Sequence, residues 1–402
     1  MVKNKALIIP ILIALVILPR LSIDLYLPSL PNIAKEFQSD DAFLQMTLTI
    51  FMFGYALSML IAGPLSDALG RKGVMMAGLI IYLFATLTCV ITDSIYTLIA
   101  ARFFQALGGC CGTVIARVMV KDSYSREEQI HILAQLSAAM AICPLFIPIL
   151  GGTLQIYYGW RSAFYALGLI AILLLMVCGQ QMSSPPVDKQ SLSLKILLNH
   201  YKMLLTNRLF IGYSLTIGFA WSSYFAFTLE SPFLFQQLLG FNALSFGALF
   251  VVTVIGYLIG TRLTKLFANE LGWDKLILIA TLLCLLGALA MGTLLILIPL
   301  NWALILFPMM LIMLGIGIII PCTQAAVMQP FPKIAGTASG LFFFIQMLFG
   351  GLCGLALQTF KSNSALPLVV AILISCLMLF IIFYTIVWRP QHRPKLIDIL
   401  AS

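Results

Sequence analysis

Five ionisable side chains interrupt stretches of sequence that are otherwise apolar. An ionised group inside a membrane costs several kcal/mol unless it is paired or hydrated, so each one is a candidate functional residue. A buried carboxylate can take up and release a proton, and a nearby arginine can hold it ionised. These residue types therefore suggest proton uptake and release within the membrane. The five residues are Arg20, Asp24, Arg102, Arg117 and Glu230.

Asp24 and Arg102 are the two residues that we expect to carry this chemistry. Their segments run in opposite directions, and at about 1.5 Å per helical residue the depths of the two side chains differ by roughly 6 Å. We expect them to meet, with Asp24 binding the proton and Arg102 modulating it. A static ion pair is the alternative, because Arg20 lies four residues before Asp24 on the same helix face.

Two further charged residues have roles that the sequence leaves open. Glu230 precedes Ser231 and Pro232 at the outer end of its segment. It is either a second acid for protons or substrate, or a group in the outside water. Arg117 lies near the inner end of its segment, where pairing with loop acids would make it part of an inner gate.

Long apolar segments must position these side chains. The 402 residues are 61% hydrophobic, with a mean hydropathy of +1.07, and a membrane helix needs about 20 apolar residues. Lys3 and Lys5 before the first segment could mark a cleaved signal peptide, but no cleavage site follows, so we expect a membrane helix there. The sequence predicts an all-α membrane protein with twelve helices, at 6–27, 41–65, 73–92, 95–119, 128–157, 161–180, 208–235, 242–268, 275–298, 300–327, 333–359 and 364–388.

The distribution of basic residues predicts the orientation of the chain. Most of the 23 lysines and arginines fall in alternate breaks, which places both termini in the cytoplasm. Basic loops on the anionic inner leaflet explain the net charge of +9 without a nucleic-acid partner. The longest polar break divides the chain into two six-helix bundles, 1–180 and 208–402, with a linker at 181–207. Residues 191–205 of this linker could form an amphipathic helix on the membrane surface.

The residue types that support catalysis or metal binding are scarce. The nine cysteines lie in apolar segments without metal-ligand spacing, and none of the three histidines lies deep in a membrane segment. We therefore expect no metal and no cofactor. A membrane enzyme would need a catalytic constellation that we do not find, a channel would need a selectivity-filter signature, and direct use of ATP would need a phosphate-binding loop. We expect a protein that is not an enzyme.

A charged turn between the second and third predicted helices identifies a family. It runs from Gly63 to Lys72 and matches the pattern G-x-L-x-D-x-x-G-R-K. It resembles the corresponding loop of major facilitator superfamily transporters. The resemblance implies that Asp67, Arg71 and Lys72 belong to a gate that closes the inner ends of the two halves. The alternative is an ordinary basic loop at the cytoplasmic surface.

Other motifs resemble the Bcr/CflA branch of twelve-helix drug:proton antiporters. The run from Asp24 to Pro31 matches D-x-Y-L-P-x-L-P, and the run from Arg102 to Gly108 is similar to R-x-x-Q-G-x-G, with alanine at the first glycine. Further along, Gly336–Gly340 with Gln346 also fits the branch. In the fifth helix Pro148, Gly151 and Gly152 match the end of the antiporter signature, which implies a role in gating. Cys143 and Ile147 stand where that signature has glycines, and ordinary helix packing is the alternative.

The resemblance implies a function and a substrate site. We expect proton-coupled efflux of small amphipathic or drug-like compounds across the bacterial inner membrane by a monomer surrounded by lipid. A dedicated exporter of one metabolite, such as a siderophore or amino-acid derivative, is the alternative, and Arg20 favours it because a cation suits an acidic ligand. Aromatic walls suit lipophilic ligands. The predicted substrate-binding residues are Arg20, Tyr26, Tyr55, Trp221, Tyr224, Phe225, Phe343 and Gln346.

Overall fold

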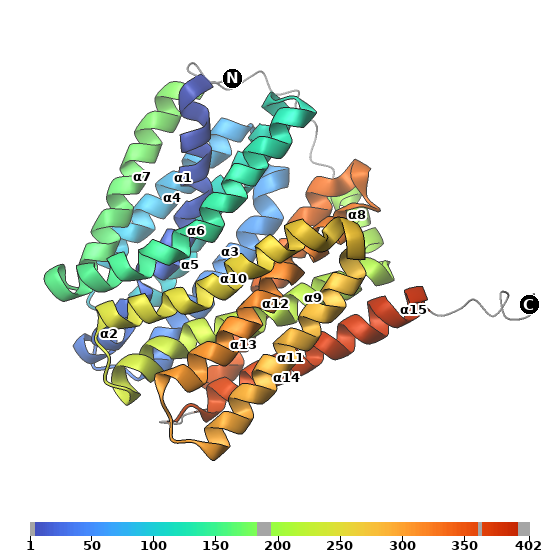
Figure 1. The fold of residues 1–402 in the computed structure, drawn as a ribbon. Coiled ribbons are helices and arrows are strands. Elements are labelled where there is room, and N and C mark those ends of the chain that lie inside the picture. The colour runs from blue at the N-terminus through green and yellow to red at the C-terminus, as the bar shows by residue number, and fades with distance from the viewer. Residues whose placement is uncertain (1–4, 183–193, 361–363, 393–402) are drawn as a thin grey trace, which may run out of the picture.

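The fold is a bundle of long helices, seen here in a computed structural model (Figure 1). The structure describes residues 5–182, 194–360 and 364–392, and every regular element in these ranges is a helix. Residues 183–193 of the predicted linker lie outside the described residues. One continuous cluster of buried apolar side chains runs through the bundle.

The first part of the chain forms a bundle of antiparallel helices. Their order is α1 (Lys5–Asp24), η1 (Leu27–Ser29), α2 (Leu30–Glu36), α3 (Asp41–Leu69), α4 (Arg71–Ile91), α5 (Ile95–Ser123), α6 (Arg126–Tyr158) and α7 (Arg161–Gln181). We call these elements the first group.

The remainder of the chain repeats this pattern after a short helix. The predicted amphipathic helix corresponds to α8 (Leu194–Thr206). The second group then consists of α9 (Arg208–Phe233), η2 (Leu234–Leu238), α10 (Ala243–Leu271), α11 (Trp273–Leu297), α12 (Trp302–Met328), η3 (Pro332–Ile334), α13 (Ala335–Gln358), α14 (Leu366–Ile382), η4 (Phe383–Trp388) and α15 (Arg389–His392).

Length and hydropathy qualify eleven stretches of the described chain as membrane spans. The helix left out is α9, although it has 26 residues. Its serines, threonines and tyrosines lower its hydropathy, and most of them are buried against other helices. The twelve predicted segments all coincide with long helices.

The predicted first helix, 6–27, differs from the observed one. The structure ends α1 at Asp24, and the chain turns through Tyr26 into η1 and α2 before Glu36. Pro28 and Pro31 explain the break, because a proline ring has no N–H to continue a helix but is tolerated in a first turn. The break leaves the Asp24 carboxylate at the last turn of a helix that is interrupted in the middle of a membrane-length segment.

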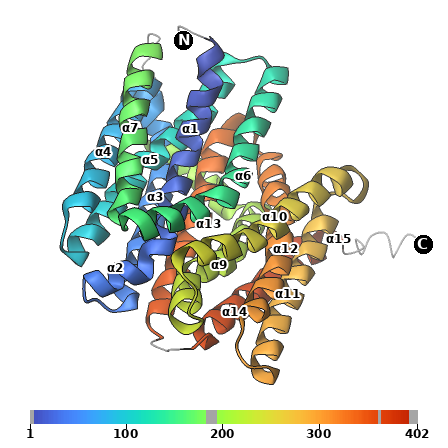
Figure 2. The same cartoon turned by 60° about the vertical axis from the view of Figure 1, so that its left-hand side comes forward.

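The two groups pack along two helix pairs, α3 with α13 and α6 with α10. We name two opposite faces: the Arg71 face, where α3 ends and α4 begins, and the Glu230 face, where α9 ends and α10 begins. In Figures 1 and 2 the groups meet near α2 and the end of α9, whereas their other ends, toward the N-terminus and α15, point apart. The boundary between the groups is therefore tighter at the Glu230 face.

Candidate functional site

The last turn of α1 carries a buried ion pair. Arg20 Nε lies 2.6 Å from Asp24 Oδ2, and the Asp24 side chain is fully buried. The other carboxylate oxygen, Oδ1, has no hydrogen-bond partner. Since a carboxylate normally satisfies both oxygens when it is buried, this oxygen is a free acceptor inside the protein.

Arg20 also links α1 to the second group. Its Nη2 donates a hydrogen bond to the Tyr224 hydroxyl of α9, and its guanidinium lies 5.3 Å from the centre of the same ring. Cys143 of α6 and Tyr257 of α10 lie within electrostatic range of this cluster. Helices α1 and α9, one from each group, thus meet at one charged centre, and a relative movement of the groups must change the contacts of Arg20.

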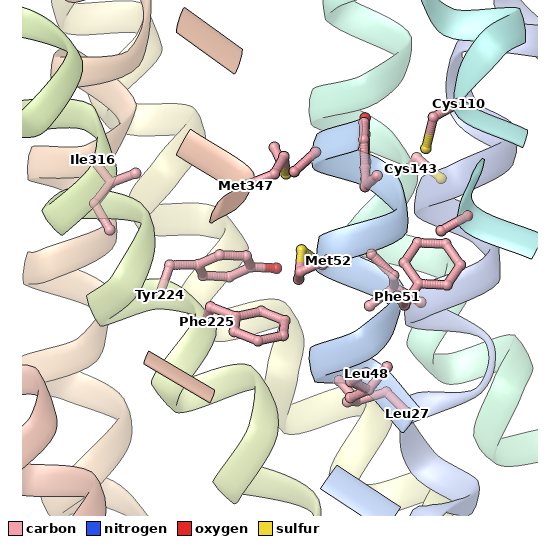
Figure 3. Close-up of a cluster of buried hydrophobic side chains, with 14 of the residues drawn as sticks. Leu27, Leu48, Phe51, Met52, Cys110, Cys143, Tyr224, Phe225, Ile316 and Met347 are labelled. Carbon is pink, nitrogen blue, oxygen red and sulfur yellow. The ribbon is translucent and has the colours of Figure 1, made fainter. Parts of the chain in front are cut away.

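Figure 3 shows how Tyr224 crosses this boundary. Its hydroxyl points from α9 toward Met52 of α3, with Phe225 beside it and Met347 of α13 nearby. Tyr224 and Phe225 are almost completely buried. An apolar and sulfur-containing wall therefore surrounds the hydroxyl that accepts the Arg20 hydrogen bond.

Arg102 is fully buried and forms no ion pair among the described side chains. Its guanidinium carbon lies 4.4 Å from the ring centre of Phe51 and 4.6 Å from that of Tyr26, and Nη1 donates to Gln105 Oε1 at 2.5 Å. Its Nε and Nη2 have no partner. Cation–π contacts with these rings take the place of a counterion.

The predicted meeting of Asp24 and Arg102 does not occur in this conformation. Asp24 pairs with Arg20, as in the static-pair alternative, and Arg102 faces the aromatic rings. Tyr26, predicted to bind substrate, is instead fully buried beneath Arg102 and bonded to Thr47 Oγ1 at 3.0 Å. Both Asp24 and Arg102 retain unpartnered polar atoms, so each has unused hydrogen-bonding capacity.

Glu230 lies at the edge of a cavity of about 650 Å³. It accepts a hydrogen bond of 3.0 Å from Gln45 of α3. Asp40 and Asp41 line the same cavity. Glu230 is thus separate from Asp24, and the structure gives it a neutral partner and contact with an open space.

The predicted gating turn forms its contacts within the first group. Arg71 pairs with Asp67 and, at 3.2 Å, with Asp122 at the end of α5. Lys72 Nζ donates to the carbonyl oxygens of Gly179 at 2.8 Å and Met182 at 2.6 Å, at the end of α7. In this conformation the turn ties α3, α4, α5 and α7 together and makes no ion pair with the described residues of the second group.

Arg117 contacts the second group without a carboxylate. Its guanidinium lies 5.0 Å from the ring centre of Phe343 on α13 and contacts Met140 of α6. The expected pairing with loop acids is not seen among the described residues. Arg117 and Phe343 instead make a cation–π contact between the two groups.

The predicted glycines of α6 lie where backbones touch. A side chain at Gly151 would come within 2.4 Å of Leu25 O, and one at Gly152 would come within 2.4 Å of Ala243 O at the start of α10. A side chain at Gly247 of α10 would likewise come within 2.4 Å of Pro148 O. Only glycine fits such approaches, so α6 seals against α1 and α10 near the Glu230 face.

The other predicted substrate residues lie along the boundary between the groups. Trp221 of α9 packs on Tyr224 with a free indole N–H, and Gln346 of α13 has a free, buried carbonyl oxygen. Tyr55 of α3 is 9% exposed. A mostly apolar substrate with few polar groups could bind at this boundary, with its polar groups hydrogen-bonded to these free atoms and its apolar part against the aromatic rings.

Sequence reasoning gave no role to three residues at these sites. Gln105 holds Arg102 and donates to Thr86 Oγ1 at 2.8 Å. Cys143 and Tyr257 lie near the Asp24 centre. The motif that contains Arg102 also contains Gln105, so that signal was present in the sequence, whereas nothing local distinguishes Tyr257 from the other tyrosines.

These features define a helical membrane protein with two groups of helices around a charged centre, and comparisons with known proteins identify the family. The family model of the Major Facilitator Superfamily matches residues 12–355. The chain belongs to this superfamily and is a multi-pass membrane transporter.

The relatives include proteins named for drug resistance. The chain is 29% identical over 350 residues to multidrug resistance protein D of Escherichia coli (strain K12), covering 85% of each chain. It is 25% identical over 359 residues to a bicyclomycin resistance protein homolog of Haemophilus influenzae, covering 87% of this chain and 88% of the relative. The resemblance to the Bcr/CflA branch is confirmed by these matches.

A solved structure supports the fold. A D-xylose-proton symporter superposes with a TM-score of 0.72 at 14% identity, covering 92% of this chain and 97% of the symporter. At this identity the likeness concerns the fold alone.

Proposed function

We propose that this protein exports small amphipathic compounds from the bacterial cytoplasm in exchange for protons. The observation that carries the proposal is the Asp24 centre, where a fully buried carboxylate has one free oxygen and one arginine partner. That arginine also bonds to Tyr224 in the other group, so movement of the groups changes the environment of the acid. When Arg20 leaves, Asp24 in an apolar setting takes up a proton.

The proposed transport cycle is alternating access around this centre. The two groups rock so that the substrate boundary opens first at one face and then at the other. The Arg71 face is the cytoplasmic one, because the basic turn at Arg71 and Lys72 lies there. In this arrangement α9 is the twelfth crossing, stabilised by its neighbours, both termini are cytoplasmic, and the transporter acts as a monomer.

The proposed substrate lies between Arg20 and the aromatic residues of α9 and α13. Trp221 and Gln346 supply free polar atoms, and Tyr224 and Phe225 supply apolar area. The relatives named for drug resistance support a drug-like substrate. Arg102, held by Gln105 and stacked on Tyr26, would modulate Asp24 when the groups move and bring the two closer.

A narrower second candidate is export of one acidic metabolite. Arg20 and Arg117 both contact the second group. Arg20 is paired with the carboxylate of Asp24, whereas Arg117 has no carboxylate partner among the described side chains. This excess of positive charge favours an anionic or zwitterionic ligand. The two candidates differ in the charge of the compound that drives proton movement.

Proton flux in proteoliposomes tests both candidates. A pH gradient is imposed, and cationic, neutral and acidic amphiphiles are added to wild type, to Asp24→Asn and to the control Asp93→Asn, whose side chain is 90% exposed. We expect compound-triggered flux in wild type and the control, and none in Asp24→Asn. Selective triggering by acidic compounds would support the second candidate.

Either of two outcomes of this experiment would contradict the proposal. Flux that survives in Asp24→Asn removes Asp24 as the proton carrier, and Glu230→Gln then becomes the variant to measure. If reconstituted wild type takes up these compounds without moving protons, proton coupling itself is wrong.

A further inference from the structure

Glutamine side chains join the two groups at the Glu230 face. Gln45 of α3 donates to Glu230 Oε1 of α9 at 3.0 Å. In the reverse direction, Gln237 of η2 donates to Asp41 Oδ1 at the start of α3 at 3.2 Å. Each of these bonds places a neutral amide of one group on a carboxylate of the other.

Two more glutamines bridge the same boundary. Gln236 of η2 donates to the carbonyl oxygen of Pro28 at 3.0 Å, where the chain turns after α1. Gln358, the last residue of α13, donates to Thr49 Oγ1 of α3 at 2.9 Å. The four bonds therefore involve η1, α3, α9, η2 and α13, which are the elements that converge at this face.

Neutral donors make these contacts reversible. None of the five ion pairs between described side chains joins the two groups. An amide–carboxylate bond contributes modest net stability, and both partners are readily hydrated when it opens. The cavity of about 650 Å³ is lined by Asp41, Gln45, Glu230, Gln237 and Gln358, so there is room for water at three of the four bonds.

The Arg71 face has a different organisation. There Arg71 and Lys72 use their hydrogen bonds on Asp122 and on the end of α7, all within the first group. The exposed segment 131–142 of α6 also lies toward this face, with few buried side chains. Toward this face Tyr201 of α8 donates one hydrogen bond to Leu60 O of α3, at 3.3 Å. Direct hydrogen bonds between the first and second groups thus concentrate at the Glu230 face.

We propose that Gln45, Gln236, Gln237 and Gln358 form a glutamine latch that holds the Glu230 face closed and sets the balance between the two access states. The inference rests on the alternating access proposed above. It does not depend on Asp24, on protons or on the identity of the substrate. Releasing the latch shifts the resting protein toward opening at the Glu230 face and closing at the Arg71 face.

Hydrogen exchange of the full-length protein, without substrate or pH gradient, tests the latch. The variant is Gln45→Met/Gln358→Met, which removes two donors and keeps side chains of similar length. We expect faster exchange in 27–39 and 234–242 and slower exchange in 131–142, because one face opens as the other closes. A net hydrogen bond corresponds to a shift of about fivefold in the equilibrium.

The control is Gln38→Met, an exposed glutamine on the same face, which should leave exchange unchanged in 234–242 and 131–142, the two segments that do not contain it. Unchanged exchange in the double variant would overturn the latch. Faster exchange at the Glu230 face without slower exchange in 131–142 would also overturn it, since that pattern is local loosening. Because no coupled flux is measured, failure of proton coupling and failure of the latch are distinguishable. The single variant Gln358→Met repeats the test with a smaller perturbation.

Discussion

At the scale of single residues, the partly buried Arg20 and the fully buried Arg102 have their positive charges stabilised by different contacts. Arg20 has a carboxylate, Asp24, at 2.6 Å. Arg102 has the faces of Phe51 and Tyr26 and one amide oxygen from Gln105. The ion pair of Arg20 therefore exists only while Asp24 is ionised. The contacts of Arg102 involve no carboxylate, so they do not depend on the ionisation of Asp24.

Arg102→Met separates the structural and functional roles of this residue. Methionine fills the space between the rings, and replacing a buried charge with an apolar group of similar volume is often neutral or stabilising. We expect an unchanged or higher melting temperature together with loss of compound-triggered proton flux. The control Arg208→Met changes a basic residue at the start of α9 that bonds only to a carbonyl oxygen, Thr385 O, among the described groups. Normal flux in Arg102→Met would leave Arg102 as a packing residue.

At the scale of helices, α6 combines two prolines with glycines at a backbone contact. It remains a continuous helix from Arg126 to Tyr158 in spite of Pro144 and Pro148. Its half near the Glu230 face touches the backbone at Leu25, directly after α1, through Gly151 and the backbone of α10 through Gly152. The contact leaves no space for a methyl group, so it positions the two groups as well as packing them.

Gly152→Ala should push α10 away from α6. The added carbon would lie 2.4 Å from Ala243 O, and overpacking of this kind costs about 1–3 kcal/mol. We expect a lower melting temperature and faster hydrogen exchange at the start of α10. Gly168→Ala is the matched control, because its nearest neighbour would be a side-chain carbon at an ordinary 3.8 Å. Equal melting temperatures for the two variants would show that α6 and α10 can separate freely.

Sequence reasoning located the long helices well and the site contacts poorly, for physical reasons. Segments of membrane length are encoded locally by hydropathy, so all twelve predicted ranges overlap long helices. The break after Asp24 was missed although Pro28 was visible, because a proline can also lie inside a helix, as Pro148 does. The partner of Asp24 depends on side-chain directions, and depth alone could not decide between Arg20 and Arg102.

At the scale of the whole molecule, two groups of helices share a boundary with a tight end and a looser end. The tight end combines the glycine contacts of α6 with the four glutamine bonds. The first group is further tied at its opposite end by Lys72 and Arg71. In the proposed cycle we therefore expect the first group to move as a unit while the boundary changes.

Reporter fusions test the proposed orientation and the count of crossings. Fusions of alkaline phosphatase after residues 93, 240 and 300 should be active, and fusions after 124, 193 and 272 should be inactive, because the enzyme works outside the cytoplasm. Fluorescent-protein fusions at the same points give the opposite pattern and serve as controls. The fusions after 193 and 240 bracket α9. Equal activity at these two points would show that α9 does not cross the membrane.

The composition of α9 also has a consequence for how the protein is made. A helix with many hydroxyl groups partitions weakly into lipid as an isolated segment. In the finished protein α9 is covered by α12, α13 and α14, which are synthesised after it. In the proposed twelve-crossing topology, the stable integration of α9 must therefore wait for the last helices, and we expect a chain truncated before α13 to be recognised and degraded as incomplete.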